Sequence, residues 1–197
     1  VCPDRTICGC RLGVGGRVNV ENSLAAVAAI WAAGEFSEEG LRQAMDSFGG
    51  VKRRFEVYIN TPQVVYIDDY AHHPDEIKAC ALSMRELYPD KKISVIFQPH
   101  LFSRTADFYR EFAQSLSLFD EVILTPIYPA REQPMPGVTS SLIYDLLAPH
   151  VQKQMCSRQE VLDIVREKKE QFQVLVSLGA GDLETDVPQM AQILRSV

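Results

Sequence analysis

The chain lacks a long apolar run, a nucleotide-phosphate loop and any surplus of positive charge. Its longest apolar stretch, Leu24 to Ala33, is well short of the roughly 20 residues that a spanning helix needs, so we interpret it as a core helix. A search for GxxxxGK, the loop that cradles nucleotide phosphates, finds no match. The formal net charge of −6 disfavours general binding to nucleic acid or to an anionic membrane. We therefore expect neither nucleic acid nor a membrane as a partner.

Cysteines are few and show no paired spacing. The chain has 5 of them in 197 residues, and its 46% hydrophobic content can build a core without disulfides. Cys2, Cys8 and Cys10 imitate part of a zinc cluster, but a fourth ligand at suitable spacing is missing. Cysteine usage of this kind indicates a reducing, cytoplasmic setting.

The first part of the chain has the apolar spacing of helices, and the rest alternates between predicted strands and predicted helices. Apolar residues recur at helical spacing from Asn19 to Gly34 and again from Ser37 to Phe48. Two helices alone would leave their apolar faces uncovered, so this stretch is not a domain by itself. Further along, we predict strands at 55–60, 63–69, 93–97, 121–126, 151–155 and 174–178, and helices at 75–88, 105–118, 140–147, 158–169 and 187–195.

This alternation predicts an α/β fold with a mostly parallel, Rossmann-like sheet of six strands and helices on both faces. The first two strands, joined through Thr61 and Pro62, are expected to form a hairpin that leaves one antiparallel strand at the edge. Ser157 and Glu160 have the spacing of a capping box and predict a helix start there.

The stretch 64–74, VVYIDDYAHHP, places acids and imidazoles directly after a buried strand. Ligands of open α/β sheets bind outside the carboxyl ends of the strands, so these groups are candidates for a site. Each also has an ordinary structural interpretation: Asp69 as a turn cap, and His72 and His73 as surface imidazoles. Two adjacent buried acids, however, cost desolvation unless a positive group meets them.

Cationic groups are the second candidate feature. In the loop 97–105, FQPHLFSRT, Arg104 is suited to grip a phosphate or carboxylate and His100 to donate a hydrogen bond to one. Arg53 and Arg54 stand beside the predicted edge strand, and we expect Arg53 in particular to be a solvated surface cation.

The segment 178–182, LGAGD, carries two glycines that permit close backbone approach to a ligand. It is a weak dinucleotide fingerprint, because the third glycine is absent and the segment follows the last strand. A tight strand-to-helix turn explains Gly179 and Gly181 equally well.

Four segments taken in order, GVKRRFEV, DDYAHHPDEI, FQPHLFSRTADFYREFAQSLSLFDEVIL and IYPAREQPMPGVTS, closely resemble the C-terminal domain of the Mur ligases. NVENSLAAVAA resembles the Asn-x-x-Asn helix at the end of that family's central domain. The DDYAHHP and QPH…RT pair favours the members that add L-alanine. The resemblance implies that residues 1–50 are the tail of the central, ATP-binding domain and that residues 51–197 are the C-terminal Rossmann-like domain.

The activity that the resemblance implies is ATP-dependent amide formation in peptidoglycan precursor synthesis. The carboxylate of UDP-N-acetylmuramate would attack the γ-phosphate of ATP, and the amine of L-alanine would then displace phosphate from the acyl phosphate. Mg²⁺ would offset the charge gathered in that transfer. The family's uridine-nucleotide domain and its phosphate loop would lie upstream of Val1, so we expect an inactive fragment whose partners are the missing N-terminal and central domains.

The resemblance also implies residue roles, most of them at the nucleotide. Asn22 would recognise adenine with Asn19 beside it, and Arg54 would reach the phosphates or the ribose. The ribose-binding aspartate would be Asp69. Further members of the same nucleotide-facing loop would be Tyr70, His72 and His73.

On the substrate side, His100 and Arg104 would face the substrate carboxylate and the incoming amino acid. No residue of the chain is assigned to the catalytic step itself. Val18 stands where many relatives have histidine, and Leu101 where they have arginine. These departures call into question a contact near adenine and a cationic contact to the substrate.

Two other functions fit parts of the pattern. Asp68, Asp69, His72 and His73 would suit the divalent ions of a metal-dependent phosphoesterase. A Rossmann-like module that binds a nucleotide without catalysis is the third interpretation.

Overall fold

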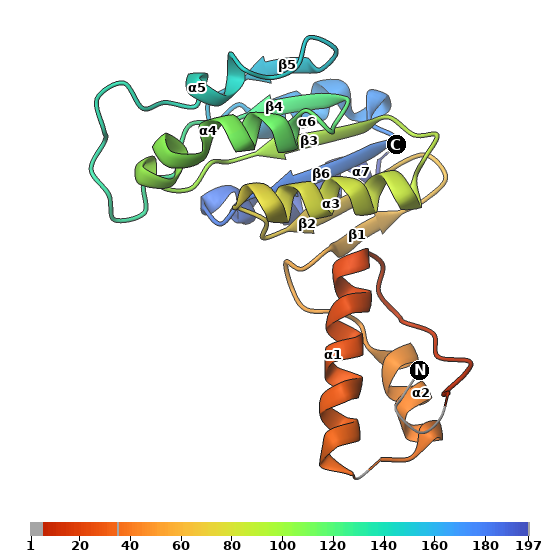
Figure 1. Ribbon diagram of the computed structural model, residues 1–197. Helices are drawn as coiled ribbons and strands as arrows, with labels where there is room; N and C mark the ends of the chain where they lie inside the picture. The colour runs from red at the N-terminus through yellow and green to blue at the C-terminus, as the bar shows by residue number, and fades with distance from the viewer. Residues whose placement is uncertain (1–5, 35, 197) are drawn as a thin grey trace.

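A computed structural model describes residues 6–34 and 36–196. Figure 1 shows a twisted sheet covered by helices, with two N-terminal helices projecting on the β1 side of the sheet. These two helices are α1 (Arg17–Ala33) and α2 (Glu38–Ser47). Gly34 ends α1 in the left-handed conformation, and the Ser37 side chain caps α2 by accepting from the N–H of Gly40. Both predicted helices are therefore confirmed, although α1 begins earlier than the pattern from Asn19 indicated.

The sheet has six strands in the order β1-β2-β6-β3-β4-β5. Strand β1 pairs antiparallel with β2, and all other neighbouring pairs are parallel. The predicted hairpin, the antiparallel edge strand and the six-stranded α/β fold are thus confirmed. The strand bounds are β1 (Glu56–Asn60), β2 (Val65–Asp69), β3 (Ile93–Phe97), β4 (Glu121–Leu124), β5 (Gln152–Met155) and β6 (Val174–Leu178).

Helices cover both faces of the sheet because successive strand residues point to opposite sides. Ile67 and Phe97 belong to a core cluster shared with α3, α4 and α5, whereas Tyr66 and Ile96 belong to one shared with α6 and α7. The bounds of these elements are α3 (Pro74–Leu87), α4 (Phe102–Leu116), α5 (Ser141–Tyr144), α6 (Val161–Lys168), α7 (Val187–Leu194) and the short 3₁₀ helices η1 (Lys169–Gln171) and η2 (Asp182–Asp186).

Two helices are shorter than the pattern predicted. Instead of spanning 140–147, α5 is a single turn, and the Ser140 hydroxyl donates to the carbonyl of Thr125 at 2.7 Å. Helix α6 begins three residues later than expected, at Val161. The N–H of Ser157 donates to the Glu160 carboxylate at 2.7 Å, so the capping residues form a turn that precedes the helix.

The N-terminal helices touch the sheet-bearing part through few contacts. The backbone N–H of Arg17 donates to the Ser83 hydroxyl of α3 at 3.3 Å, and a side chain at Gly16 would meet the ring of Phe55. None of the residues of α1 is buried. Within the described ranges, no helix combines the length and the apolar character that crossing a membrane would require.

Candidate nucleotide and substrate site

The loops at the carboxyl ends of the parallel strands are bonded to one another. The Gln98 side chain, after β3, donates to Asp182 at 2.7 Å and accepts from the N–H of Leu183 at 3.0 Å, which joins the loops after β3 and β6. The N–H of Leu101 donates to the carbonyl of Tyr128 at 2.9 Å, which joins the loops after β3 and β4. This edge is therefore one connected surface.

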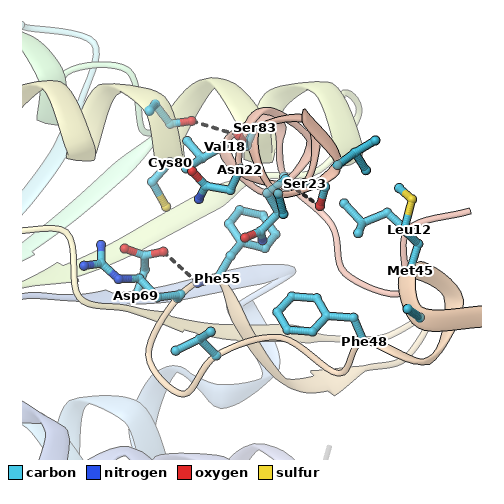
Figure 2. Close-up of a pocket in the computed structure, with 18 of the residues that line it drawn as sticks. Leu12, Val18, Asn22, Ser23, Met45, Phe48, Phe55, Asp69, Cys80 and Ser83 are labelled. Carbon is cyan, nitrogen blue, oxygen red and sulfur yellow. Dashed lines mark hydrogen bonds between the residues drawn. The ribbon is translucent and has the colours of Figure 1, made fainter. Parts of the chain in front are cut away.

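A pocket of about 720 Å³ opens between the N-terminal helices and α3. We call it the α1–α3 pocket, and Figure 2 shows its lining. It brings together Asn19 and Asn22 of α1, Arg54 of the connecting segment and Asp69 at the end of β2. These candidates come from three separate stretches of sequence, and the rest of the lining is mainly apolar.

Asp69 has a structural role in addition to its place in the pocket. Its carboxylate accepts from the N–H of Phe55 at 2.7 Å and from the N–H of Ala71 at 2.8 Å. Burial raises the pKa of Asp69 above its usual value, although the two N–H groups and the nearby Arg54 act in the opposite direction. The turn-capping interpretation of Asp69 is therefore correct, and the same carboxylate attaches the connecting segment to the sheet.

The two asparagines differ in their bonding. The Asn19 amide donates to the carbonyl of Gly15 at 2.7 Å, so it stabilises the start of α1. Asn22, one turn further along, is exposed to the pocket, and its side chain forms no hydrogen bond with the residues that the structure describes. The side-chain amide of Asn22 thus has donors and an acceptor available for a ligand.

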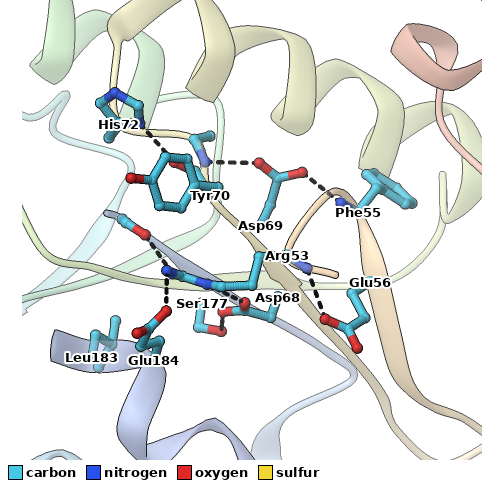
Figure 3. Close-up of polar contacts among 12 residues, drawn as sticks. Arg53, Phe55, Glu56, Asp68, Asp69, Tyr70, His72, Ser177, Leu183 and Glu184 are labelled. Carbon is cyan, nitrogen blue, oxygen red and sulfur yellow. Dashed lines mark hydrogen bonds and ion pairs between the residues drawn. The ribbon is translucent and has the colours of Figure 1, made fainter. Parts of the chain in front are cut away.

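The prediction that Arg53 is a solvated surface cation is wrong. Its side chain is 13% exposed and forms an ion pair with Asp68 at 3.1 Å and another with Glu184 at 2.6 Å. Arg53 therefore supplies the positive group that the buried Asp68 requires. Figure 3 shows these contacts around the end of β2. Arg54 is the exposed member of the pair and lines the α1–α3 pocket.

Beside the pocket lies a group of rings that we call the ring cluster: Tyr70, His72, His100 and Tyr128. Ring centroids are 5.0 Å apart for Tyr70 and His72, 6.1 Å for His72 and His100, and 5.7 Å for His100 and Tyr128. His73 is turned away from this cluster and packs against Phe108 of α4, with centroids 5.0 Å apart. The histidine pair therefore splits, and only His72 faces the residues of the next loop.

His100 and Arg104 carry unused hydrogen-bonding atoms. Within the described part of the chain, His100 Nδ1 and an Arg104 Nη atom are buried and have no hydrogen-bond partner. Burial lowers the pKa of His100, and the positive charge of Arg104 and the neighbouring His72 lower it further. A buried guanidinium nitrogen without a partner, beside an imidazole that can also donate, favours a ligand with an anionic group, such as a carboxylate.

The sequence pattern did not single out Glu132. This residue attaches the loop that carries Tyr128 to the start of α4. Its carboxylate accepts from the backbone N–H of Ser103 at 3.0 Å and also from the Ser103 hydroxyl. Helix α4 has no capping side chain of its own, because Leu101 occupies the N-cap with φ of 74°. A glutamate from a distant loop therefore supplies the cap, and only the tertiary fold reveals this.

The acids and histidines near β2 do not converge on a metal ion. Asp68 is bound by Arg53 and Ser177, Asp69 by backbone N–H groups, and His72 contacts the carbonyl of Tyr70 at 2.8 Å. Over residues 6–34 and 36–196, no group of three or more His, Cys, Asp and Glu side chains is placed to hold a metal ion. The geometry therefore does not favour the phosphoesterase. Cys8 and Cys10 are exposed free thiols, and Cys2 lies outside the described residues.

Comparison with known proteins identifies relatives of the whole chain. The UDP-N-acetylmuramate–L-alanine ligase of Phocaeicola vulgatus is 52% identical over 194 residues, which are 98% of this chain and 42% of that protein. The ligase of the same name from Porphyromonas gingivalis W83 is 50% identical over 96% of this chain and 41% of its own length. The chain thus spans about two fifths of the length of the curated relatives it matches.

Solved structures agree with these sequences. The crystal structure of the UDP-N-acetylmuramate–alanine ligase MurC from Thermotoga maritima superposes with a TM-score of 0.73 at 29% identity, over 95% of this chain and 40% of that one. Folylpolyglutamate synthase from the same organism, at 17% identity and a TM-score of 0.68, shares the fold. Residues 53–183 match the family described as Mur ligase, glutamate ligase domain. This match covers more than half of the sequence, and the chain belongs to the Mur ligase family.

Proposed function

We propose that this chain is the C-terminal part of a cytoplasmic, ATP-dependent ligase that joins L-alanine to UDP-N-acetylmuramate. The relatives at 50% and 52% identity carry that ligase name, and this supports the assignment over other acid–amino-acid ligases. Residues 1–50 are the tail of the central domain and residues 51–197 the C-terminal domain. The remaining parts of the polypeptide supply the other substrate sites, so the chain alone is inactive.

In this proposal the α1–α3 pocket receives the nucleotide. Asn22 contacts adenine through its free side-chain amide while Asn19 holds the start of α1 in place, and Asp69 lies at the ribose. Arg54 projects into the pocket from the connecting segment and meets the phosphates or the ribose. Tyr70, His72 and His73 complete the nucleotide-facing loop, with His73 acting through its packing on α4.

In the same proposal, His100 and Arg104 bind the carboxylate of the substrate or the incoming amino acid. The lowered pKa of His100 leaves the imidazole neutral at neutral pH, so it offers one donor and one acceptor, while Arg104 supplies the positive charge. These groups position the carboxylate that attacks ATP or the amino acid that attacks the acyl phosphate. Positioning of this kind supplies much of the rate enhancement in phosphoryl transfer.

Mg²⁺ belongs to the proposed reaction, but among the described residues no group of three or more His, Cys, Asp and Glu side chains is placed to hold it. Mg²⁺ commonly keeps several waters and binds through substrate phosphates and one or two carboxylates. We therefore expect the ion to be held by ATP and by other parts of the polypeptide, and we assign no step in this chain to it.

The observation that carries the proposal is the convergence of Asn22, Arg54 and Asp69 on one pocket in a member of this family. The test measures phosphate release by the full-length protein with ATP, Mg²⁺, UDP-N-acetylmuramate and L-alanine, omitting each in turn. Release that requires all four supports the ligase. Release without the amino acid or the sugar nucleotide would support a phosphohydrolase in its place.

Arg54→Ala tests the nucleotide assignment directly. Loss of a charge-assisted contact predicts a rise of roughly ten- to a hundredfold in the KM for ATP. Lys52→Ala is the matched control, because Lys52 is an exposed cation two residues away that does not line the pocket. An unchanged KM in Arg54→Ala would contradict the role of Arg54.

A further inference from the structure

Arg53 is the most heavily bonded side chain of the segment that joins the N-terminal helices to the sheet. Its Nε donates to Asp68 at 3.1 Å, one Nη to Glu184 at 2.6 Å and the other Nη to the carbonyl of Gly179 at 2.5 Å. Asp68 is the residue before the last in β2, Gly179 follows β6 and Glu184 lies in η2. One guanidinium therefore attaches the connecting segment to two neighbouring strand ends (Figure 3).

The backbone on either side of Arg54 is held in an unfavourable conformation. Arg53 has φ of 59° and Phe55 has φ of 52°, the left-handed region that residues with a side chain rarely adopt. Such a conformation persists only when surrounding contacts impose it. Here the N–H of Arg53 donates to Glu56 at 2.8 Å, its carbonyl accepts from Tyr70 at 2.8 Å, and Phe55 donates to Asp69.

This conformation places two adjacent arginines in opposite environments. Arg53 points into the sheet edge, whereas Arg54 is exposed and lines the α1–α3 pocket. Both guanidiniums lie over the ring of Tyr70, at 5.0 Å for Arg53 and 5.7 Å for Arg54. Cation–π contact with the one ring thus stabilises both charges.

Arg53 is ion-paired within the protein, whereas Arg54 acts on the Asp69 and Glu76 carboxylates only from a distance. Asp68 is 2% exposed and also accepts from the Ser177 hydroxyl at 2.5 Å, so its carboxylate is fixed toward Arg53. Among the described residues, the Arg54 guanidinium forms no hydrogen bond or ion pair, and it contacts the ring of Tyr70. The positive charge available to an anion in the pocket is therefore that of Arg54.

We infer that Arg53 is a positioning residue for nucleotide binding: its side-chain bonds to Asp68, Gly179 and Glu184, together with the backbone bonds of the turn, hold the strained conformation that aims Arg54 into the α1–α3 pocket. Without these bonds the segment relaxes, and Arg54 samples orientations outside the pocket. The inference rests on the proposed role of Arg54 at the nucleotide. It assigns to Arg53 no contact with the ligand.

The test is a double-mutant cycle in the full-length protein, with the Kd of a non-hydrolysable ATP analogue as the readout. Arg53→Gly removes the anchoring side chain, and glycine adopts a positive φ without strain, so the fold is kept. We expect Arg53→Gly and Arg54→Ala each to weaken binding by roughly tenfold or more. The double variant is expected to bind no more weakly than Arg54→Ala alone, because Arg53 acts through Arg54.

Two further variants separate positioning from general stability. Lys52→Gly adds the same flexibility one residue earlier without removing a contact, and it is expected to keep the wild-type Kd. Arg53→Lys keeps the charge but loses the fork that reaches three partners, so intermediate binding is expected. The melting temperature of each variant is measured beside its Kd.

The outcomes are distinguishable. Effects of Arg53→Gly and Arg54→Ala that add in the double variant would overturn the inference, since Arg53 would then act independently of Arg54. A wild-type Kd for Arg53→Gly would overturn it as well, while leaving the proposed function intact if Arg54→Ala still weakens binding. A wild-type Kd for Arg54→Ala would contradict the proposed function at this residue and the inference together.

Discussion

The imidazole of His100 lies where three loops meet, stacked on Tyr128 and facing His72 across the carboxyl edge of the sheet. Burial, then Arg104, then His72 lower its pKa from the ordinary value of 6.5, while Glu132 opposes them. A lowered pKa means that the unfolded chain takes up this proton at a higher pH than the folded chain does. Stability is therefore complete above pH 6.5 and is lost as the pH falls toward the folded pKa.

His100→Gln is expected to remove this part of the pH dependence. Wild type should lose thermal stability between about pH 8 and pH 5 more steeply than the variant does, because glutamine cannot take up the proton. The measurement is the melting temperature of both proteins across this range. His150→Gln, at an exposed histidine before β5, controls for the loss of an imidazole elsewhere. Parallel curves for wild type and His100→Gln would show that His100 does not titrate differently on folding.

The LGAGD turn after β6 fits the sequence pattern both of a tight structural turn and of a dinucleotide-binding loop, and the structure distinguishes the two. Gly181 lies against the side chains of Gln98 and Tyr128, and a Cβ there would be 2.8 Å from the Cβ of Tyr128. Gly179 has φ of 140°, and a Cβ at this position would be 2.7 Å from the carbonyl oxygen of Gln98. Both glycines are therefore required by the packing of the turn, which favours the structural interpretation over a dinucleotide loop.

Gly181→Ala should destabilise the fold by about 1 to 3 kcal/mol, because the loops after β3 and β4 must move to admit the methyl group. The check is the free energy of unfolding from a urea titration. Gly49→Ala is the matched control, since a Cβ at Gly49 meets no atom within 4 Å and no positive φ is involved. Equal stability of the two variants would contradict the packing described for the turn.

At this scale, sequence patterns located the elements well, because the alternation of apolar runs and helical periods is local information. The β2 and β6 strands and the hairpin through Thr61 and Pro62 follow from it. The opposite roles of Arg53 and Arg54 do not, because the partners of Arg53 are up to 131 residues away in sequence. The separation of His73 from His72 likewise depends on Phe108, which belongs to a different helix.

At the scale of the whole molecule, the notable feature is that the apolar residues of α1 are left uncovered. A helix with apolar residues all round is normally buried, yet Leu24 is 62% exposed, Val20 49% and Val18 46%, and no residue of α1 is buried. The relatives are more than twice as long as this chain. In our proposal, the rest of the central domain packs on these exposed residues and completes the α1–α3 pocket.

Hydrogen exchange, compared between the 197-residue chain and the full-length protein, tests whether further residues pack on α1. In the 197-residue chain, the amides of α1 are expected to exchange orders of magnitude faster than those of β3 and β6, because few buried contacts hold the helix. In the full-length protein, α1 should gain protection while β3 and β6, which are fully buried already, change little. Protection of α1 that is the same in both proteins would mean that nothing further packs on it. The division of the chain at residue 50 would then be wrong, and the α1–α3 pocket would have to bind its ligand without help from the rest of the polypeptide.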